Sequence, residues 1–249
     1  MTKKAWYIGC SENDVANRVI LIGDPGRVPR LSQYLDDVVM LPVSRGLATA
    51  TGTCQGVPIT LAAFGMGAPI ASIVLHELSE LGCGIFLRIG TTMCLPPITT
   101  GDFVIAESAL RREGTSYAYA PKEFAATADE ELVTALERAA ATSGNAYHVG
   151  QFASYDGFYR DMFALDDSTA KRVRTNFDDL STQGVIAVDM ETSALLTVGK
   201  VLGCKVGSFC VTSVNALTQQ KLPSEKFMKR ERQLVSTALS ALCSLPDPE

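Results

Sequence analysis

One arginine lies inside a run of apolar residues. The segment GIFLRIGTT (84–92) places three apolar residues directly before Arg88 and one directly after it. A run of this kind, rich in β-forming residues and closed by a glycine, predicts a strand buried on both faces, where an unpaired guanidinium would be very costly. Arg88 therefore needs an anion, which is either a structural carboxylate or a ligand.

A second candidate anion site follows the predicted strand 19–22. The segment VILIGDPGR ends in a tight turn with Gly23 and Arg27, where backbone N–H groups and a guanidinium could hold an anion. Taken alone, such a turn is more often an ordinary loop, and the Walker pattern is absent. Arg88, followed by Gly90, Thr91 and Thr92, marks the end of another predicted strand. It offers a second guanidinium, and the threonines offer hydroxyl donors, at the place where open α/β sheets usually bind ligands. The two sites together favour an oxyanion such as phosphate.

A carboxylate with an unusual position follows in VDMETSALLTVGKVLG. We predict a helix over 189–202, with Asp189 as its cap. Three apolar residues share the face of Glu191 at helical spacing: Leu195, Val198 and Leu202. The Glu191 carboxylate should therefore point toward the core edge, where it either pairs with Arg88 or accepts hydrogen bonds from substrate hydroxyls.

Alternating strands and helices have to position these residues. Short β-branched apolar runs predict strands at 19–22, 58–64, 84–89, 103–106, 185–188 and 206–212. Amphipathic patterns predict helices over 68–82, 128–143, 189–202 and 224–243. This order predicts an α/β fold, a single domain over 1–249 with a mixed, largely parallel central sheet flanked by helices. The charged run KRERQ (229–233) is interpreted as the solvent-exposed face of the last helix.

Composition argues against several classes of partner. The 27 acidic and 22 basic residues give a net charge of −5 and are scattered, which favours neither nucleic acid nor an anionic membrane surface. Seven cysteines without a C-x-x-C pair and the lack of an apolar leader or spanning segment predict a reducing, cytoplasmic setting. With only two histidines, neither a zinc site nor a Ser/His/Asp triad can be assembled. A small-molecule partner is the expectation that remains.

Six segments in order resemble the successive motifs of the nucleoside phosphorylases with an α/β fold, and among these most the uridine phosphorylases. The segments are GDPGR, FLRIGTT, GDFVIAESALRREGTSYAYAP, ASYDGFY, VDMETSALL and VNALTQQKLP. The resemblance covers nearly the whole chain. It implies a phosphorylase/hydrolase-like fold and a pentosyltransferase that cleaves a ribonucleoside with phosphate, giving ribose 1-phosphate and free base. Inorganic phosphate would be a co-substrate, with no metal and no organic cofactor.

The resemblance also implies a role for individual residues. Phosphate would be bound by Gly23, Arg27, Arg88 and Thr91, and a neighbouring subunit would contribute its Arg45 to the same site. Ribose would be bound by Met190, Glu191 and Tyr7, and the base by Phe158, Met162 and Ala164. Arg88 and Glu191 would be the catalytic pair. The resemblance also implies a homo-oligomer built from dimers, with a hexamer as the expected assembly.

This chain departs from the uridine phosphorylase pattern in the base pocket. Met162 and Ala164 stand where those enzymes have a glutamine and an arginine that read uracil, and Ala216 stands where they have a further arginine. Tyr7 replaces a histidine, and Gly46 replaces a glutamate that holds a monovalent cation between subunits. The purine enzymes' base-protonating acid is missing too. Uridine is the favoured substrate, with a purine nucleoside phosphorylase or a non-catalytic nucleoside-binding protein as alternatives.

Overall fold

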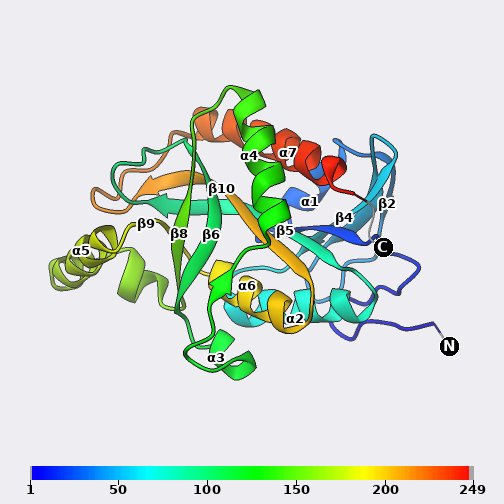
Figure 1. Ribbon diagram of the computed structural model, residues 1–249, viewed down its shortest axis with the longest axis horizontal. Helices are drawn as coiled ribbons and strands as arrows, with labels where there is room; N and C mark the ends of the chain where they lie inside the picture. Colours follow the sequence, from blue (N-terminus) through cyan, green and yellow to red (C-terminus); the bar gives the residue numbers. More distant parts are fainter. Residues whose placement is uncertain (1, 247–249) are drawn as a thin grey trace.

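A computed structural model describes residues 2–246, in which strands and helices alternate along most of the chain (Figure 1). The strands are β1 (Arg18–Ile22), β2 (Asp36–Met40), β3 (Thr49–Cys54), β4 (Val57–Ala63), β5 (Ile85–Cys94), β6 (Phe103–Arg112), β7 (Ala126–Thr127), β8 (Tyr147–Tyr155), β9 (Val185–Asp189) and β10 (Lys205–Asn215). The helices are α1 (Arg27–Ser32), α2 (Ala68–Glu80), α3 (Ser116–Tyr119), α4 (Glu130–Ser143), the π-helix η1 (Phe158–Met162), α5 (Asp167–Thr182), α6 (Thr192–Val201) and α7 (Ser224–Ser244). The predicted α/β class is confirmed.

One mixed sheet connects the strands in the order β10-β6-β8-β9-β5-β1-β4-β3-β2, and the short β7 pairs with β6 outside this order. Strand β10 also pairs with β5 in parallel, so five strands close into a ring while β1, β4, β3 and β2 extend from it. The strands next to Arg88 are parallel: β1 pairs in this way with β4 and with β5. The edge strand β2 is largely exposed.

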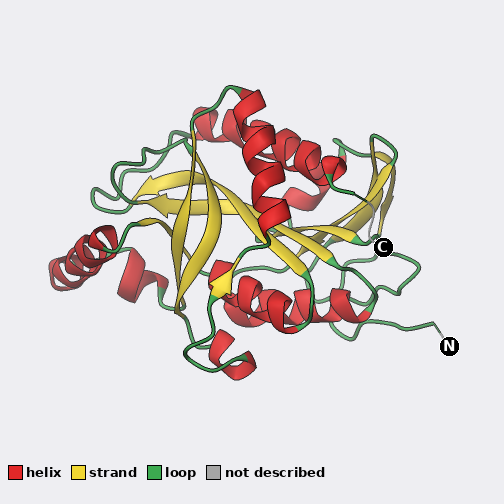
Figure 2. Ribbon diagram, in the orientation of Figure 1, coloured by secondary structure: helices red, strands yellow, loops and turns green. Residues whose placement is uncertain are grey.

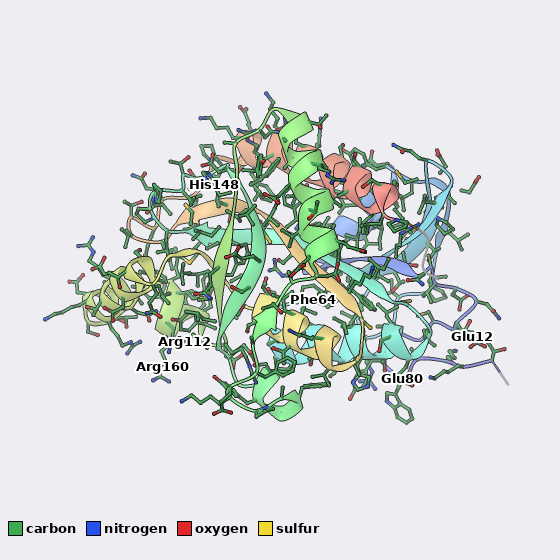
Figure 3. The ribbon with its side chains drawn as sticks, viewed as in Figure 1. Glu12, Phe64, Glu80, Arg112, His148 and Arg160 are labelled. Atoms are coloured by element: carbon green, nitrogen blue, oxygen red, sulfur yellow. The ribbon has the colours of Figure 1, made fainter. Side chains whose placement is uncertain are left out.

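Helices cover both faces of this sheet (Figure 2). Helices α4 and α7 lie above the strands in Figure 1 and pack on one apolar cluster with Leu136 and Leu234. Helices α2 and α6 lie below the strands and pack on a second cluster with Leu75 and Leu195. In Figure 3 the labelled Phe64, which is fully buried, lies in the interior, whereas Glu80 projects outward. Strand β5 therefore runs between two layers of apolar side chains, as its sequence predicts.

Candidate active site

Several segments meet where strand β1 ends. Ile22, the last residue of β1, is paired with Ala63 of β4 and with Ile89 of β5. Because these strands are parallel, the turn from Gly23 follows β1 at the same edge where β4 gives way to the loop before α2. Strand β5 continues five residues past Ile89, to Cys94, so its Gly90–Thr92 segment lies inside the strand and not after it. The predicted end of this strand at residue 89 was too early.

Arg88 is paired with two carboxylates. It is 4% exposed, and its Nη2 donates to Oε2 of Glu191 at 2.6 Å and lies 3.2 Å from Oδ2 of Asp189. Its Nη1 donates to Sγ of Cys210 at 2.7 Å, while Nε is buried and has no hydrogen-bond partner among the described residues. Burial alone would lower the pKa of Arg88. The net pKa is raised above its ordinary value because the neighbouring thiol and the two carboxylates stabilise the charged form.

Gly90 leaves the space that the Arg88 guanidinium occupies. A Cβ built at Gly90 would lie 2.8 Å from Nη1 of Arg88, closer than real Cβ contacts come. Side chains two residues apart in a strand share a face, so any residue but glycine here would collide with the arginine. The sequence R-x-G within β5 is therefore a local requirement for the conformation of Arg88.

Glu191 lies just before helix α6 and not within it. The helix begins at Thr192, so the predicted start at 189 was wrong, and Glu191 is the N-cap residue. Asp189 ends β9, but its carboxylate accepts from the Thr192 N–H at 3.2 Å and so does contribute to capping, as predicted. Oε1 of Glu191 accepts from the backbone N–H of Gly67 at 2.8 Å, and its Oε2 accepts from Arg88. The carboxylate is buried, as expected, and it ties the loop before α2 to the arginine.

Arg27 begins helix α1 and is also buried. It is 6% exposed, and its Nε lies 2.6 Å from Oε1 of Glu231 on α7. Its Nη2 is buried without a hydrogen-bond partner in the described part of the chain. Burial lowers the pKa of Arg27, against the opposing effect of Glu231. The interpretation of residues 229–233 as wholly solvent-exposed is thus wrong at Glu231.

Thr92 is one of the two threonines whose hydroxyls the sequence offers as donors beside Arg88. Strand alternation places it on the same face as Arg88, and its Oγ1 is buried without a hydrogen-bond partner among residues 2–246. Thr91, the residue predicted to bind phosphate, is half-buried and points to the opposite face by the same alternation. The sequence motif contains both threonines, and only their alternation along the strand shows which of them shares the face of Arg88.

The residues predicted to contact the base gather in one apolar cluster. It includes Met162 and Ala216, each 2% exposed, with Phe158, Ala164 and Met190 packed against them. Phe158 stacks on Phe163 with ring centroids 5.8 Å apart. Ala164 and Ala216 also line a cavity of about 600 Å³ beside helix α5. The structure therefore unites the base residues with Met190, the predicted ribose contact, and it gives them an apolar environment.

Arg45 and Tyr7 contact each other. The guanidinium carbon of Arg45 lies 4.6 Å from the centroid of the Tyr7 ring, and Arg45 is exposed. Within residues 2–246 neither side chain makes a hydrogen bond or an ion pair with Arg88 or Glu191. One chain alone therefore does not bring these two predicted residues to the other candidates.

Three further findings concern cofactors, thiols and membranes. In the part of the chain that the structure describes, no three or more His, Cys, Asp or Glu side chains are grouped so that they could hold a metal ion. The seven cysteines are all free, and four of them are buried. None of the helices formed by residues 2–246 is both long and apolar enough to span a bilayer.

Comparison with known proteins decides the family. Residues 17–245 match the family model described as the phosphorylase superfamily. The chain belongs to the phosphorylase superfamily. This superfamily member is 37% identical to a uridine phosphorylase of Thermococcus kodakarensis over 218 residues, 86% of this chain and 79% of that protein. It is 36% identical to a uridine phosphorylase of Escherichia coli over 231 residues, 90% of this chain and 91% of that protein.

A relative named for a different substrate aligns over a still larger share of both chains. A guanosine phosphorylase of Halorubrum lacusprofundi is 30% identical over 243 residues, 94% of this chain and 96% of that protein. The resemblance inferred from the six motifs is confirmed by these matches.

Proposed function

We propose that this superfamily member is a nucleoside phosphorylase that uses inorganic phosphate to cleave the N-glycosidic bond of a ribonucleoside, with uridine as the favoured substrate. One observation supports this most: two buried arginines, Arg88 and Arg27, keep guanidinium nitrogens that have no hydrogen-bond partner within residues 2–246, namely Nε of the first and Nη2 of the second. Buried donors of this kind are costly unless a ligand accepts from them. A dianionic phosphate is such a ligand, and Arg88 thus serves a substrate besides its two structural carboxylates.

The chemistry follows from the charges that develop. As the bond between C1′ and the base nitrogen breaks, the ribose gains positive charge and the base leaves with the electron pair, taking up a proton. A phosphate held by Arg88 and Arg27, with Gly23 and the threonine pair Thr91–Thr92 beside them, attacks C1′ and balances the charge of the sugar. Ribose 1-phosphate and free base result. No step requires a metal ion or an organic cofactor.

Glu191 is suited to orient the ribose. Each of its two oxygens accepts one hydrogen bond, from Gly67 and from Arg88, which leaves further lone pairs for sugar hydroxyls. The carboxylate is ion-paired with Arg88, and a charged acceptor binds hydroxyl donors more strongly than a neutral one. The pair therefore links the phosphate to the sugar, with Met190 as the apolar contact of the ribose.

The base is bound by an apolar wall. Phe158, Met162 and Ala164 supply surface for stacking and packing, without the polar readers that uridine phosphorylases have at two of these positions. Relatives named uridine phosphorylase support uridine as the substrate. A purine nucleoside phosphorylase is the second candidate, favoured by this apolar wall and by the guanosine phosphorylase among the relatives.

A neighbouring subunit completes the site in this proposal. Tyr7 and Arg45 lie together and Arg45 is exposed, so both could enter the phosphate and ribose sites of an adjacent copy. The assembly is a homo-oligomer built from dimers, with a hexamer as the expected form. The free cysteines fit a reducing, cytoplasmic location.

A nucleoside panel tests the function. Uridine, inosine, guanosine and adenosine are each incubated with the full chain, with and without inorganic phosphate, and free base and ribose 1-phosphate are quantified. Release of base only with phosphate, together with ribose 1-phosphate, is the expected result. Release of base without phosphate would identify a hydrolase instead, and binding without turnover under both conditions would identify a nucleoside-binding protein.

A further inference from the structure

Glu231 is a buried acid on helix α7 inside a strongly charged segment. Its neighbours Lys229 and Arg232 are exposed, whereas Glu231 is 8% exposed. Leu234 and Val235, three and four residues later, are buried on the same face of the helix. The acid therefore lies on the core-facing stripe of α7, and its burial requires a cationic partner.

Arg27 is that partner, and the contact uses one particular edge of the guanidinium. Oε1 of Glu231 lies 2.6 Å from Nε of Arg27 in an ion pair, although neither atom makes a hydrogen bond of regular geometry within residues 2–246. Nη2 of Arg27 is also buried without a hydrogen-bond partner among these residues. Because Arg27 is buried and the charge of Glu231 attracts the Nε edge of its planar guanidinium, this ion pair restrains the direction of the other nitrogens. One edge thus contacts the acid, and the buried Nη2 remains available to a ligand.

We propose that Glu231 is a positioning residue for phosphate binding, which fixes the Arg27 guanidinium so that Nη2 faces the phosphate. The proposal rests on the proposed phosphate site. It assigns a role to helix α7, which supplies none of the residues that would touch a substrate.

A second basic residue lies near the same acid and has to be distinguished. Nη2 of Arg30 lies 3.6 Å from Oε1 of Glu231 and 3.7 Å from Oδ2 of Asp24. Arg30 is half exposed, with 51% of its side chain accessible, so this outer contact is screened by solvent. The competing explanation is that Glu231 only fastens helix α1 to helix α7, with no effect on phosphate.

The test is the effect of Glu231→Gln on the two substrates separately. The variant keeps the shape and one acceptor but loses the charge, so Arg27 is held less firmly. We expect the KM for phosphate to rise at least fivefold while the KM for uridine changes less than twofold. Glu225→Gln, an exposed acid in the first turn of the same helix, is the matched control and should leave both KM values unchanged.

A double-mutant cycle separates positioning from fastening. Arg27→Ala should itself raise the KM for phosphate, and adding Glu231→Gln to Arg27→Ala should then cause no further rise. A purely structural role predicts instead a lowered Tm with unchanged phosphate KM in Glu231→Gln, and this outcome would overturn the proposal. If Glu231→Gln does not fold, Glu231→Asp keeps the charge on a shorter stem, and an unchanged phosphate KM in that variant would overturn it equally.

Failure of the proposed function would look different. Wild-type protein that releases base without phosphate contradicts the phosphorylase proposal, and a folded Arg27→Ala protein with unchanged phosphate KM contradicts the role of Arg27. An increase in phosphate KM for Arg27→Ala, but none for Glu231→Gln, contradicts the positioning role of Glu231 alone.

Discussion

Two regions of the site differ in what stabilises them. Arg88 and Glu191 belong to a group of buried, ion-paired side chains, whereas Met162 and Ala216 belong to an apolar cluster stabilised by packing. In the charged region each contact has a direction, as in the 2.6 Å hydrogen bond from Nη2 of Arg88 to Oε2 of Glu191. Removing one partner of a buried ion pair leaves the other unpaired and typically costs about 3–5 kcal/mol. In the apolar region, side chains of similar volume replace one another at small cost. The phosphate and ribose end therefore tolerates little change, and the base end tolerates much.

The difference has a functional meaning. A site that hydrogen-bonds a polar edge rejects ligands without that edge by factors of about 10⁴–10⁵, whereas a hydrophobic pocket discriminates by only about 10–200-fold. Phosphate and ribose are common to all nucleoside substrates of this reaction, and only the base varies. The division of the site predicts strict dependence on phosphate together with modest discrimination between bases.

The largest effect is expected at Arg88. Arg88→Ala removes a charge-assisted contact to phosphate. We expect kcat/KM for phosphate to fall about 30- to 1,000-fold, which corresponds to a loss of about 2–4 kcal/mol of transition-state stabilisation. The unpaired carboxylates of Glu191 and Asp189 should also lower the Tm. Initial rates at varied phosphate, measured well below the Tm, test this. Unchanged phosphate kinetics in a folded variant would contradict the assignment of Arg88 to the phosphate site.

The next effect is expected at Gly90, where no charge is altered. A Cβ at Gly90 would lie 2.8 Å from Nη1 of Arg88, so Gly90→Ala must displace the guanidinium. Overpacking of this kind costs about 1–3 kcal/mol, and we expect a higher phosphate KM together with a lower Tm. Gly114→Ala is the control for the general effect of replacing a glycine, because Gly114 is exposed, has no positive φ, as is true of Gly90, and its added Cβ would make only an ordinary contact at 3.6 Å. Equal phosphate KM values in both variants would show that Arg88 moves without consequence.

Glu191 should give a smaller effect on catalysis. Glu191→Gln keeps the shape and one acceptor but loses the charge that ribose hydroxyls and Arg88 prefer, so activity should fall at least tenfold, about 1.4 kcal/mol. The test measures kcat/KM for uridine and, in parallel, the thermal unfolding curve of the variant. Intact activity with a lowered Tm would mean that the pair with Arg88 is structural only.

The sequence predicted the elements whose patterns are strong. Strand β5 begins with an apolar run and helix α2 has a clear amphipathic pattern, and the single charged residue within the β5 run was sufficient to single out Arg88. Helix α5 was missed because it is very polar, with only Val173, Phe177 and Leu180 buried. Strand β2 was missed because it is an exposed edge with little apolar periodicity.

The contacts between distant segments could not be predicted. Closure of the ring depends on pairing β5 with β10, more than one hundred residues later in the chain, and no local pattern encodes that choice. Glu231 was assigned to solvent because its neighbours are charged. A signal was nevertheless present, since Leu234 and Val235 follow it at helical spacing and indicate a core-facing position.

The smallest effect is expected in the base pocket, and the two reader positions differ there. Met162 is packed in the apolar cluster, so Met162→Gln would bury a polar group and cost about 1–3 kcal/mol of stability unless the amide finds a partner. Ala164 is partly exposed and lines the cavity of about 600 Å³, so Ala164→Arg has room for its side chain. The arginine substitution is therefore the cleaner test of the two.

We expect Ala164→Arg to shift the ratio of kcat/KM for uridine over inosine by about fivefold toward uridine, since one added hydrogen bond contributes about 1 kcal/mol net. The double variant with Met162→Gln should extend the shift if it remains folded, which a thermal unfolding curve reports. Arg174→Ala, which removes another side chain that lines the same cavity, controls for a general change in the cavity and should leave the ratio unchanged. A wild-type enzyme already strict for uridine would contradict the contrast between the two ends of the site, because strict discrimination requires polar readers that this apolar wall does not supply.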